Sequence, residues 1–376
     1  MGGIIQPRPG AEISMPDFLI NSLRPHAGRC TVPCYVDWWR QTLLVRFARG
    51  VLAVTIVAVG LLPGKSNAAA APTASDDGAK ITAERWLDET TLDVTVSSPA
   101  LGESVPVRIL VPKRWTRTAA RTWPVVYAFH GGRDTYVSWT RSTDIKQVAA
   151  DYDVMVVMPD TGWAGWFTDW WNYGKGGAPK WETFHTVELL ELMERNYRAG
   201  TSRATMGISS AGYGAVKYAA RHPGMFAYAA SFSGVLHLTQ LGVPAFALLQ
   251  ASERYDALRI WGDPLTNRKN WEANDPYELA SHLRGTGLYI ASGLTGLPGP
   301  NDHPAVGDDL IHPQEVICGS TSVSFVNRLK KLGIPATTHI YQNGWHNWST
   351  WQPEMHRAWP LIMKAIGAQP TLRVQA

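Results

Sequence analysis

One serine in this sequence stands among small residues, at the point where a predicted strand runs into a predicted helix. Residues 207–212 read Gly-Ile-Ser-Ser-Ala-Gly, which resembles the G-x-S-x-G turn with Ala211 in place of the second glycine. Such a turn holds a hydroxyl rigid and exposed, as attack on an ester or thioester requires. The pattern predicts Ser209 as the nucleophile, and Ser210 is the less favoured alternative.

A histidine that follows the last predicted strand is the expected general base. His346 lies in the run Asn-Gly-Trp-His-Asn-Trp at 343–348, directly after a strand predicted at 337–341. A base in this place fits the chain order Ser, acid, His. His339 falls within the strand and His356 on the terminal helix, so structural roles are expected for both.

The residue that orients His346 is not decided by spacing. In this chain order the acid lies between the strand predicted at 287–292 and the histidine. Four carboxyl residues fall there: Asp302, Asp308, Asp309 and Glu315. Asp302 is nearest to the strand, whereas Glu315 opens the next helical stretch, so both remain candidates.

Attack on an ester produces a negatively charged oxygen that needs two preorganised N–H donors. Ser210, the residue after the nucleophile, is expected to supply one through its backbone. The loop His-Gly-Gly-Arg at 130–133 follows a strand predicted at 125–129, and glycine lets a backbone approach a substrate closely. We therefore expect Gly132 to supply the second N–H, and His130 to shape the loop and not to act as a base.

Strand-like and helix-like segments alternate along most of the chain. Strands are predicted at 92–97, 105–112, 125–129, 153–159, 203–208, 227–233, 287–292 and 337–341. Helices are predicted at 183–197, 211–221, 322–332 and 355–366. This alternation predicts an α/β fold with a mostly parallel central sheet and helices on both faces. Active sites of such sheets lie at the carboxyl ends of strands, where Gly132, Ser209 and His346 all fall.

The segments from 81 to 370 are predicted to form one domain. Residues 235–283 contain a helix and several loops, and they are interpreted as a small insertion over the site. In the helix at 183–197 the apolar stripe consists of Val187, Leu190 and Met193, with glutamates between them. Residues 72–80 are small and polar and are predicted to be a linker.

The first 71 residues are predicted to be a leader that contains a signal peptide. Arg46 and Arg49 precede an apolar run at 51–62, and small residues follow at 68–71, which is the order of an export signal. The run is too short to span a hydrocarbon core of about 30 Å at about 1.5 Å per residue. Cleavage near 69–71 predicts a protein that is secreted or held in the cell envelope, and a retained membrane anchor is the alternative.

The composition is that of an ordinary globular protein. Hydrophobic residues make up 45% of the 376 and charged residues 18%, and the net charge of +4 includes no basic block of the kind that binds nucleic acid. His and Asp are scattered without tetrahedral ligand spacing, so neither a metal nor another cofactor is expected.

Of the three cysteines, Cys318 lies outside the leader and is expected to be a small buried residue. The 17 tryptophans crowd at 163–181 and 345–359, where they either pack in the core or contact substrate.

These segments together resemble the antigen 85 and S-formylglutathione-hydrolase type of esterase family, in which antigen 85 proteins are secreted mycolyltransferases and diacylglycerol acyltransferases. The resemblance covers nearly all of the chain after Ala79. Its most specific part is Thr-Asp-Trp-Trp at 168–171, followed by Gly-Lys at 174–175 and Lys-Trp-Glu-Thr-Phe at 180–184. The Ser-Ser-Ala-Gly turn at 209–212 is similar to the family's Ser-Met-Ala-Gly, and His-Asn-Trp at 346–348 to its His-Ser-Trp.

The resemblance implies an α/β-hydrolase fold, and it favours Glu315 over Asp302 as the acid. The residues that it places at a substrate site are Arg133, Trp348, Asp169 and Trp170. The sequence departs from the family at His130, where antigen 85 proteins have an Asp that belongs to their trehalose site.

Three functions are consistent with these residues. The first is acyl transfer from an ester or thioester donor to an alcohol, by a serine acyltransferase or esterase with a Ser-Glu-His triad. The second is simple carboxylester hydrolysis, with water as the acceptor. The third is a non-catalytic binding protein on the same scaffold. The expected partners are the acyl donor, an alcohol or water, and cell-envelope lipid.

Overall fold

A computed structural model describes residues 72–371 of the chain. The predicted leader lies outside the described residues, together with its apolar run at 51–62 and its cleavage site near 69–71. Within the part of the chain that is described, no helix combines the length and apolarity needed to cross a lipid bilayer.

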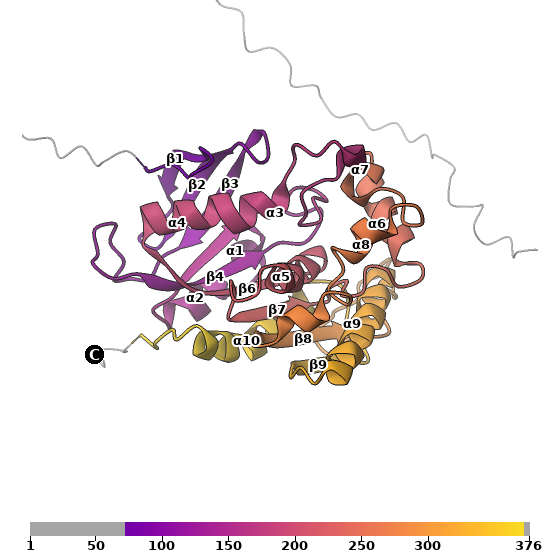
Figure 1. Ribbon diagram of the computed structural model, residues 1–376. Helices are drawn as coiled ribbons and strands as arrows, with labels where there is room; N and C mark the ends of the chain where they lie inside the picture. The colour runs from indigo at the N-terminus through magenta and orange to yellow at the C-terminus, as the bar shows by residue number, and fades with distance from the viewer. Residues whose placement is uncertain (1–71, 372–376) are drawn as a thin grey trace, which may run out of the picture. The chain divides into compact units, whose positions relative to one another are not determined.

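A sheet forms the centre of the molecule, and its nine strands in the described residues follow the order β1-β2-β3-β5-β4-β6-β7-β8-β9 (Figure 1). The strands are β1 (Lys80–Trp86), β2 (Thr91–Ser98), β3 (Glu103–Leu110), β4 (Trp123–Phe129), β5 (Met155–Pro159), β6 (Ala199–Ile208), β7 (Tyr228–Phe232), β8 (Gly287–Gly293) and β9 (Thr337–Tyr341). β1, β2 and β3 pair antiparallel with their neighbours, and the pairings among β4 to β9 are parallel. The mostly parallel sheet predicted from the sequence is confirmed.

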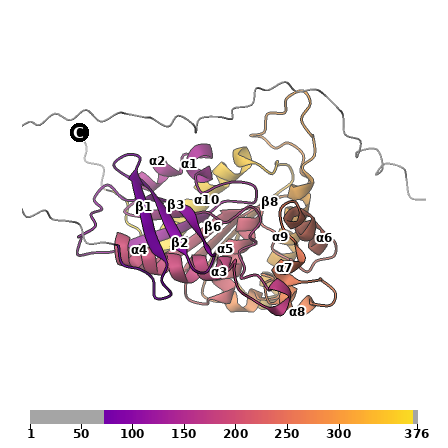
Figure 2. The same ribbon diagram turned by 90° about the horizontal axis from the view of Figure 1, so that it is seen from above.

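Helices cover both faces of this sheet, as predicted (Figure 2). One face carries α3 (Trp181–Thr183), α4 (Leu189–Tyr197), α5 (Ser210–Arg221) and α9 (Pro313–Leu332). The other carries α1 (Ser138–Ser142), α2 (Ile145–Ala150) and α10 (Trp348–Ala365). Each face has its own cluster of buried apolar side chains, with Leu189 and Phe325 in the first and Trp139 and Met355 in the second. Because both faces are covered, a strand such as β5 is buried along its whole length and shows no alternation.

The insertion at 235–283 consists of short helices next to α9 (Figures 1 and 2). They are α6 (Val243–Ser252), α7 (Leu258–Trp261), α8 (Arg268–Glu272) and the 3-10 turn η4 (Ala280–Leu283), and a further 3-10 turn, η2 (Asn172–Gly174), follows β5. The insertion leaves the sheet after β7 and returns at β8, so it starts and ends close to the strands that carry the site.

The segment before β1 is held against the molecule although it contains no helix or strand. Thr73 exchanges two hydrogen bonds with Asn196, through its N–H at 2.6 Å and its carbonyl at 2.8 Å. Arg195 pairs with Asp76 at 2.6 Å. Of the linker predicted at 72–80, the part before β1 is thus fastened to α4, and Lys80 is the first residue of β1.

Several elements differ from the prediction for local reasons. The sequence does not predict β1, because this polar edge strand buries only Ile81. Helices α9 and α10 begin earlier than 322 and 355, and α10 continues through Pro353 and Pro360, which ordinarily argue against a helix.

The predicted helix at 183–197 is interrupted by a π-helical turn, η3 (Phe184–Glu188). A π turn holds an extra residue and therefore rotates the residues that follow it around the helix axis. The predicted apolar stripe is wrong at this point, because Val187 is 41% exposed while Glu188 is fully buried. The Glu188 carboxyl accepts hydrogen bonds from the Ala100 N–H at 2.7 Å and from the Ser98 hydroxyl.

The buried carboxyl of Glu188 predicts a pH-dependent stability. Burial raises the pKa of Glu188 to about 7, from an ordinary 4.5. Below pH 4.5 the folded and unfolded chains both keep the proton, so the stability contributed by this group is fully present, and it is lost as the pH rises through about 7. Glu188→Gln is therefore expected to raise the melting temperature relative to the wild type more at about pH 8 than at about pH 4.5. Thermal melts at both pH values test this, and an equal difference at the two would contradict it.

Candidate active site

Ser209 lies on the sharp turn that joins β6 to α5. Its backbone has φ +53° and ψ −128°, a region that residues other than glycine rarely adopt. Its neighbours must be small, because a Cβ on Gly207 would lie 2.3 Å from the Ala211 carbonyl oxygen and one on Gly212 would lie 2.6 Å from the Ser231 hydroxyl. Strain of this kind persists where the surrounding structure enforces it, which is typical of functional positions.

His346 lies between β9 and α10 and contacts Ser209 directly. Its Nε2 is 2.8 Å from the Ser209 Oγ, and its Nδ1 is 2.7 Å from the Glu315 Oε2. An imidazole with its proton on Nδ1 donates to Glu315 and accepts from Ser209. The Trp351 ring packs edge-on against the imidazole, with 5.0 Å between centroids, so the ring orientation is fixed by packing as well as by hydrogen bonds.

Glu315 is fully buried in the first turn of α9. Its Oε1 accepts hydrogen bonds from the Gly293 N–H at 2.6 Å, the Ser233 hydroxyl at 2.8 Å and the Ser292 hydroxyl at 3.1 Å. These three donors hold the carboxyl group in place at the N-terminal end of α9. The structure thus brings Glu315 against His346, as the family resemblance implies.

Asp302, the other candidate acid, supports the histidine loop without bonding to the imidazole. Its Oδ2 accepts the backbone N–H groups of Trp345 and Gly299, both at 2.8 Å, and its Oδ1 accepts the Ser349 hydroxyl. Asp302 therefore holds the residue that precedes His346 in place.

The oxyanion loop at 130–133 lies beside Ser209, but Gly132 is arranged differently from the prediction. A Cβ on Gly131 would lie 3.2 Å from the Ser209 Cβ, which shows how closely the loop approaches Ser209. The N–H of Gly132 donates to the Ser210 Oγ at 2.9 Å. The N–H that was expected to face the substrate oxygen is thus bonded to a side chain.

His130 shapes this loop, in agreement with the sequence interpretation. The side chain is buried, and its Nε2 accepts the Thr161 N–H at 3.0 Å. Burial lowers the pKa of His130 below the ordinary value, so the ring is neutral near pH 7. It links the ends of β4 and β5, and its Nδ1 lies 2.7 Å from the Gly131 carbonyl oxygen.

A cavity of about 630 Å³ is lined by Ser209 and His346. Its polar walls include Arg133, Asp134, Gln250, Asp309, His312 and Gln314. Ile311 and Trp351 add apolar surface. The cavity is large enough for part of a drug-sized ligand and carries both hydrogen-bonding and apolar surface.

Of Arg133 and Trp348, which are both expected to contact substrate, only Arg133 lines the cavity. Arg133 lines the cavity and forms an ion pair with Glu253. Trp348 does not line it and packs edge-on against Trp139 and Trp351, with 5.1 and 5.3 Å between ring centroids. Of these two expected contacts, Arg133 is placed where a substrate would bind.

Asp169 and Trp170 have structural roles in place of the expected substrate contact. Asp169 accepts the Thr183 N–H at 2.9 Å and the Thr183 hydroxyl at 2.6 Å, which fixes the start of the helical stretch. Trp170 is only 3% exposed and packs edge-on against Tyr255. Neither lines the cavity, so the specific sequence run to which they belong reflects packing.

Several residues of the cavity wall are not predicted from the sequence, among them Gln250, His312 and Trp351. Gln250 comes from α6 of the insertion, which carries no chemical signal in the sequence. His312 accepts the His346 N–H through its Nδ1 at 3.2 Å and stacks in parallel on Trp345. Trp351 lines the cavity and lies one helical turn beyond Trp348, the tryptophan that the family resemblance places at a substrate site.

Most tryptophans of the two crowded segments are core residues. Those at most 6% exposed are Trp166, Trp170, Trp181, Trp345, Trp351 and Trp359. Packing therefore accounts for these rings, and Trp351 also reaches the cavity.

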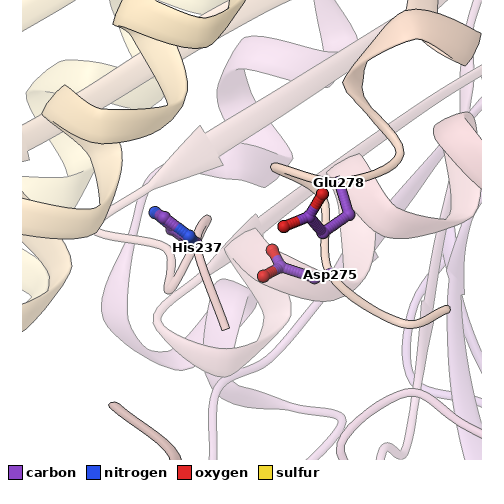
Figure 3. A group of neighbouring side chains, drawn as sticks. All are labelled: His237, Asp275 and Glu278. Atoms are coloured by element: carbon purple, nitrogen blue, oxygen red, sulfur yellow. The ribbon is translucent and has the colours of Figure 1, made fainter. Parts of the chain in front are cut away.

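Among the described residues, one group of side chains has potential metal ligands close together. The ligand atoms of His237, Asp275 and Glu278 lie within 4.8 Å of one another (Figure 3). Protein partners already satisfy two of them: His237 Nδ1 bonds to the Ser324 hydroxyl at 2.7 Å, and Asp275 accepts both the N–H and the hydroxyl of Thr239. The His237 bond fastens the insertion to α9, the Asp275 bonds lie within the insertion, and none of the three side chains lines the cavity.

Sequence comparisons place the chain among esterases. Residues 98–362 match the model of the family described as putative esterase. Esterase Rv1288 of Mycobacterium tuberculosis is 32% identical over 265 residues, which make up 69% of this chain and 55% of that protein. The chain thus spans about half the length of this curated relative. The diacylglycerol acyltransferase/mycolyltransferase Ag85B of Mycolicibacterium smegmatis is 28% identical over 286 residues, 72% of this chain and 84% of that protein.

Solved structures share the fold. MPT51 (FbpC1) of Mycobacterium tuberculosis superposes with a TM-score of 0.60 and 24% identity, covering 72% of this chain and 97% of that one. An S-formylglutathione hydrolase from Agrobacterium tumefaciens gives a TM-score of 0.59 and 17% identity, covering 76% and 99%. The predicted α/β-hydrolase fold and the resemblance to this type of esterase are confirmed, and the names of the relatives agree with the predicted acyl-transfer chemistry.

The two carboxylates near His346 are expected to differ in their effect on ester turnover. Glu315→Gln is expected to lower kcat by about 10³- to 10⁴-fold, because the imidazolium formed during the reaction loses its charged partner. Asp302→Asn keeps one acceptor for the loop and is expected to cost less than about tenfold, the equivalent of one hydrogen bond. Steady-state turnover of p-nitrophenyl butyrate measures both. A larger loss in Asp302→Asn than in Glu315→Gln would show that the acid is assigned to the wrong carboxylate.

Proposed function

The chain belongs to the putative esterase family, and we propose that it is a serine-dependent acyl-transfer enzyme in which Ser209 carries the acyl group. The observation that carries this proposal is the hydrogen-bonded chain from Ser209 to His346 to Glu315, with 2.8 and 2.7 Å between successive atoms. The strained turn and the cavity over the hydroxyl support it.

Acylation begins when the Ser209 Oγ attacks the carbonyl carbon of an ester or thioester. His346 Nε2 takes the hydroxyl proton, and Glu315 stabilises the resulting imidazolium. The carbonyl oxygen becomes an oxyanion at the N-terminus of α5, where the helix dipole and the Ser210 N–H stabilise it. When the tetrahedral intermediate collapses, His346 returns the proton to the leaving alcohol or thiol, and the acyl group remains on Ser209.

Deacylation repeats these steps with an acceptor in place of the leaving group. His346 removes a proton from the acceptor, which attacks the acyl carbon and releases Ser209. An alcohol gives a new ester, whereas water gives a free acid. The polar side chains of the cavity wall, Arg133, Asp134, Gln250 and Asp309 among them, offer hydrogen bonds to a hydroxylated acceptor.

We therefore propose transfer to an alcohol as the main reaction. Hydrolysis is the second candidate, and the esterase name of the 32% identical relative favours it. A non-catalytic binding protein would have no need of a serine, a histidine and a buried carboxylate in hydrogen-bonding sequence.

We also propose that the protein acts outside the cytoplasm, either secreted or in the cell envelope. The support is the sequence of basic, apolar and small residues from Arg46 to Ala71. In that location, the 81–370 domain would meet acyl donors and acceptors of the envelope.

The nucleophile is tested by Ser209→Ala. Turnover of p-nitrophenyl butyrate is expected to fall by about 10⁵- to 10⁶-fold, because no acyl-enzyme forms. Ser252→Ala is the matched control, since it removes an exposed hydroxyl of α6 outside the cavity lining and is expected to leave kcat unchanged. Turnover of the Ser209→Ala variant near the wild-type rate would refute the proposal.

The acceptor is tested by product partitioning. With a p-nitrophenyl ester as donor and glycerol or a sugar as acceptor, the ratio of new ester to free acid is expected to rise with acceptor concentration. Arg133→Gln is expected to lower that ratio, because it removes a charged hydrogen-bond donor from the cavity wall. Chromatography of the products measures the ratio, and free acid as the sole product at every acceptor concentration would leave hydrolysis as the function.

A further inference from the structure

The side chain of Ser210 is directed at the oxyanion loop. Ser210 is the first residue of α5 and is 6% exposed. Its Oγ accepts the Gly132 N–H at 2.9 Å, so one of the two expected oxyanion donors is already engaged. Ser210 itself is not among the residues that line the cavity, but its hydroxyl bonds to Gly132 and its backbone follows Ser209, and both of these residues line the cavity.

The Ser210 hydroxyl has one proton that is free to donate a hydrogen bond. A serine hydroxyl has two lone pairs and one proton. The Gly132 N–H occupies a lone pair, and within residues 72–371 the Ser210 proton has no hydrogen-bond acceptor. A buried hydroxyl with an unused proton next to the nucleophile is a donor prepared for an oxygen that appears only during the reaction.

We propose that the Ser210 hydroxyl is the second donor of the oxyanion hole. The Gly132 N–H donates to the Ser210 Oγ, and the Ser210 O–H donates to the oxyanion formed when Ser209 attacks. No covalent bond to Ser210 forms, and its proton stays on its own oxygen throughout. The inference rests on the proposed function, since it assigns a donor for the intermediate of that reaction.

A relay of this kind requires no rearrangement when charge develops. If the Gly132 N–H were itself to bind the oxyanion, it would first have to break its bond to Ser210. In the relay both hydrogen bonds persist, and the first polarises the second. A donor that is already in place stabilises a developing charge more effectively than one that must reorient.

The loop itself is fixed so that the relay keeps its geometry. The Arg133 N–H donates to the Trp163 carbonyl at 3.0 Å, and a Cβ on Gly132 would lie 3.4 Å from the same oxygen. The backbone next to Gly132 is therefore fixed to the loop that follows β5, and Gly132 has little freedom to turn its N–H away from Ser210.

The test compares Ser210→Ala with Ser210→Thr. Removing the hydroxyl is expected to lower kcat about 100-fold with KM unchanged, as the loss of one oxyanion donor does in acyl transfer. Threonine keeps the hydroxyl and is expected to restore most of the rate. The affinity of a trifluoromethyl ketone, which forms a tetrahedral adduct with an oxyanion, is expected to fall in proportion to kcat/KM in the alanine variant. A purely structural role for the hydroxyl would not produce that proportionality.

The outcomes separate this inference from the proposed function. Melting temperatures and mass-spectrometric detection of a fluorophosphonate adduct on Ser209 show that each variant is folded and retains its nucleophile. An unchanged or higher kcat in Ser210→Ala, or a threonine variant as slow as the alanine variant, would overturn the relay alone. Turnover that survives Ser209→Ala would overturn the proposed function instead, whatever the Ser210 variants show.

Discussion

The hydrogen bond between a buried carboxylate and an imidazole is the interaction on which the rest of the site depends. Glu315 keeps its place because Ser233, Ser292 and Gly293 donate to it, and these residues lie at the carboxyl ends of β7 and β8. His346 follows β9, the next strand of the sheet. The orientation of the imidazole is therefore set by residues at neighbouring strand ends, and two residues of the cavity wall support it: the Trp351 ring packs against the imidazole, and His312 accepts the His346 N–H.

Two strained serines show how the sheet enforces this arrangement. Ser209 and Ser233 follow the adjacent strands β6 and β7, with φ values of +53° and +51°. Each is fastened to the next strand by a backbone hydrogen bond, Ser209 to Phe232 at 2.9 Å and Ser233 to Ala291 at 2.7 Å. Continued strand pairing thus compensates for unfavourable backbone conformations, and it carries one serine to the substrate and the other to Glu315.

The sequence predicts the fold and the nucleophile because local patterns encode both: apolar strands alternate with helices, and small residues surround one serine. The acid is different, since four carboxyl residues share the same interval and only the folded chain shows that Glu315 reaches the base. The specific run at 168–171 predicts substrate contacts for Asp169 and Trp170, whereas in the structure Asp169 holds Thr183 and Trp170 is buried. A run of residues can therefore be specific because its members pack together. Val187 is exposed and Glu188 is buried, the reverse of the prediction, because the π turn at Phe184–Glu188 rotates the residues around the helix axis. The prediction from apolar spacing assumes a regular α-helix of about 3.6 residues per turn.

Trapping the acyl-enzyme tests the central claim most directly. The protein is mixed with a p-nitrophenyl ester, quenched in acid within one turnover and digested, and the modified residue is located by mass spectrometry. The account predicts a mass increase equal to the acyl group on Ser209, and loss of the adduct when His346 is replaced by alanine. An acyl group on Ser210, or on no residue while turnover proceeds, would contradict it.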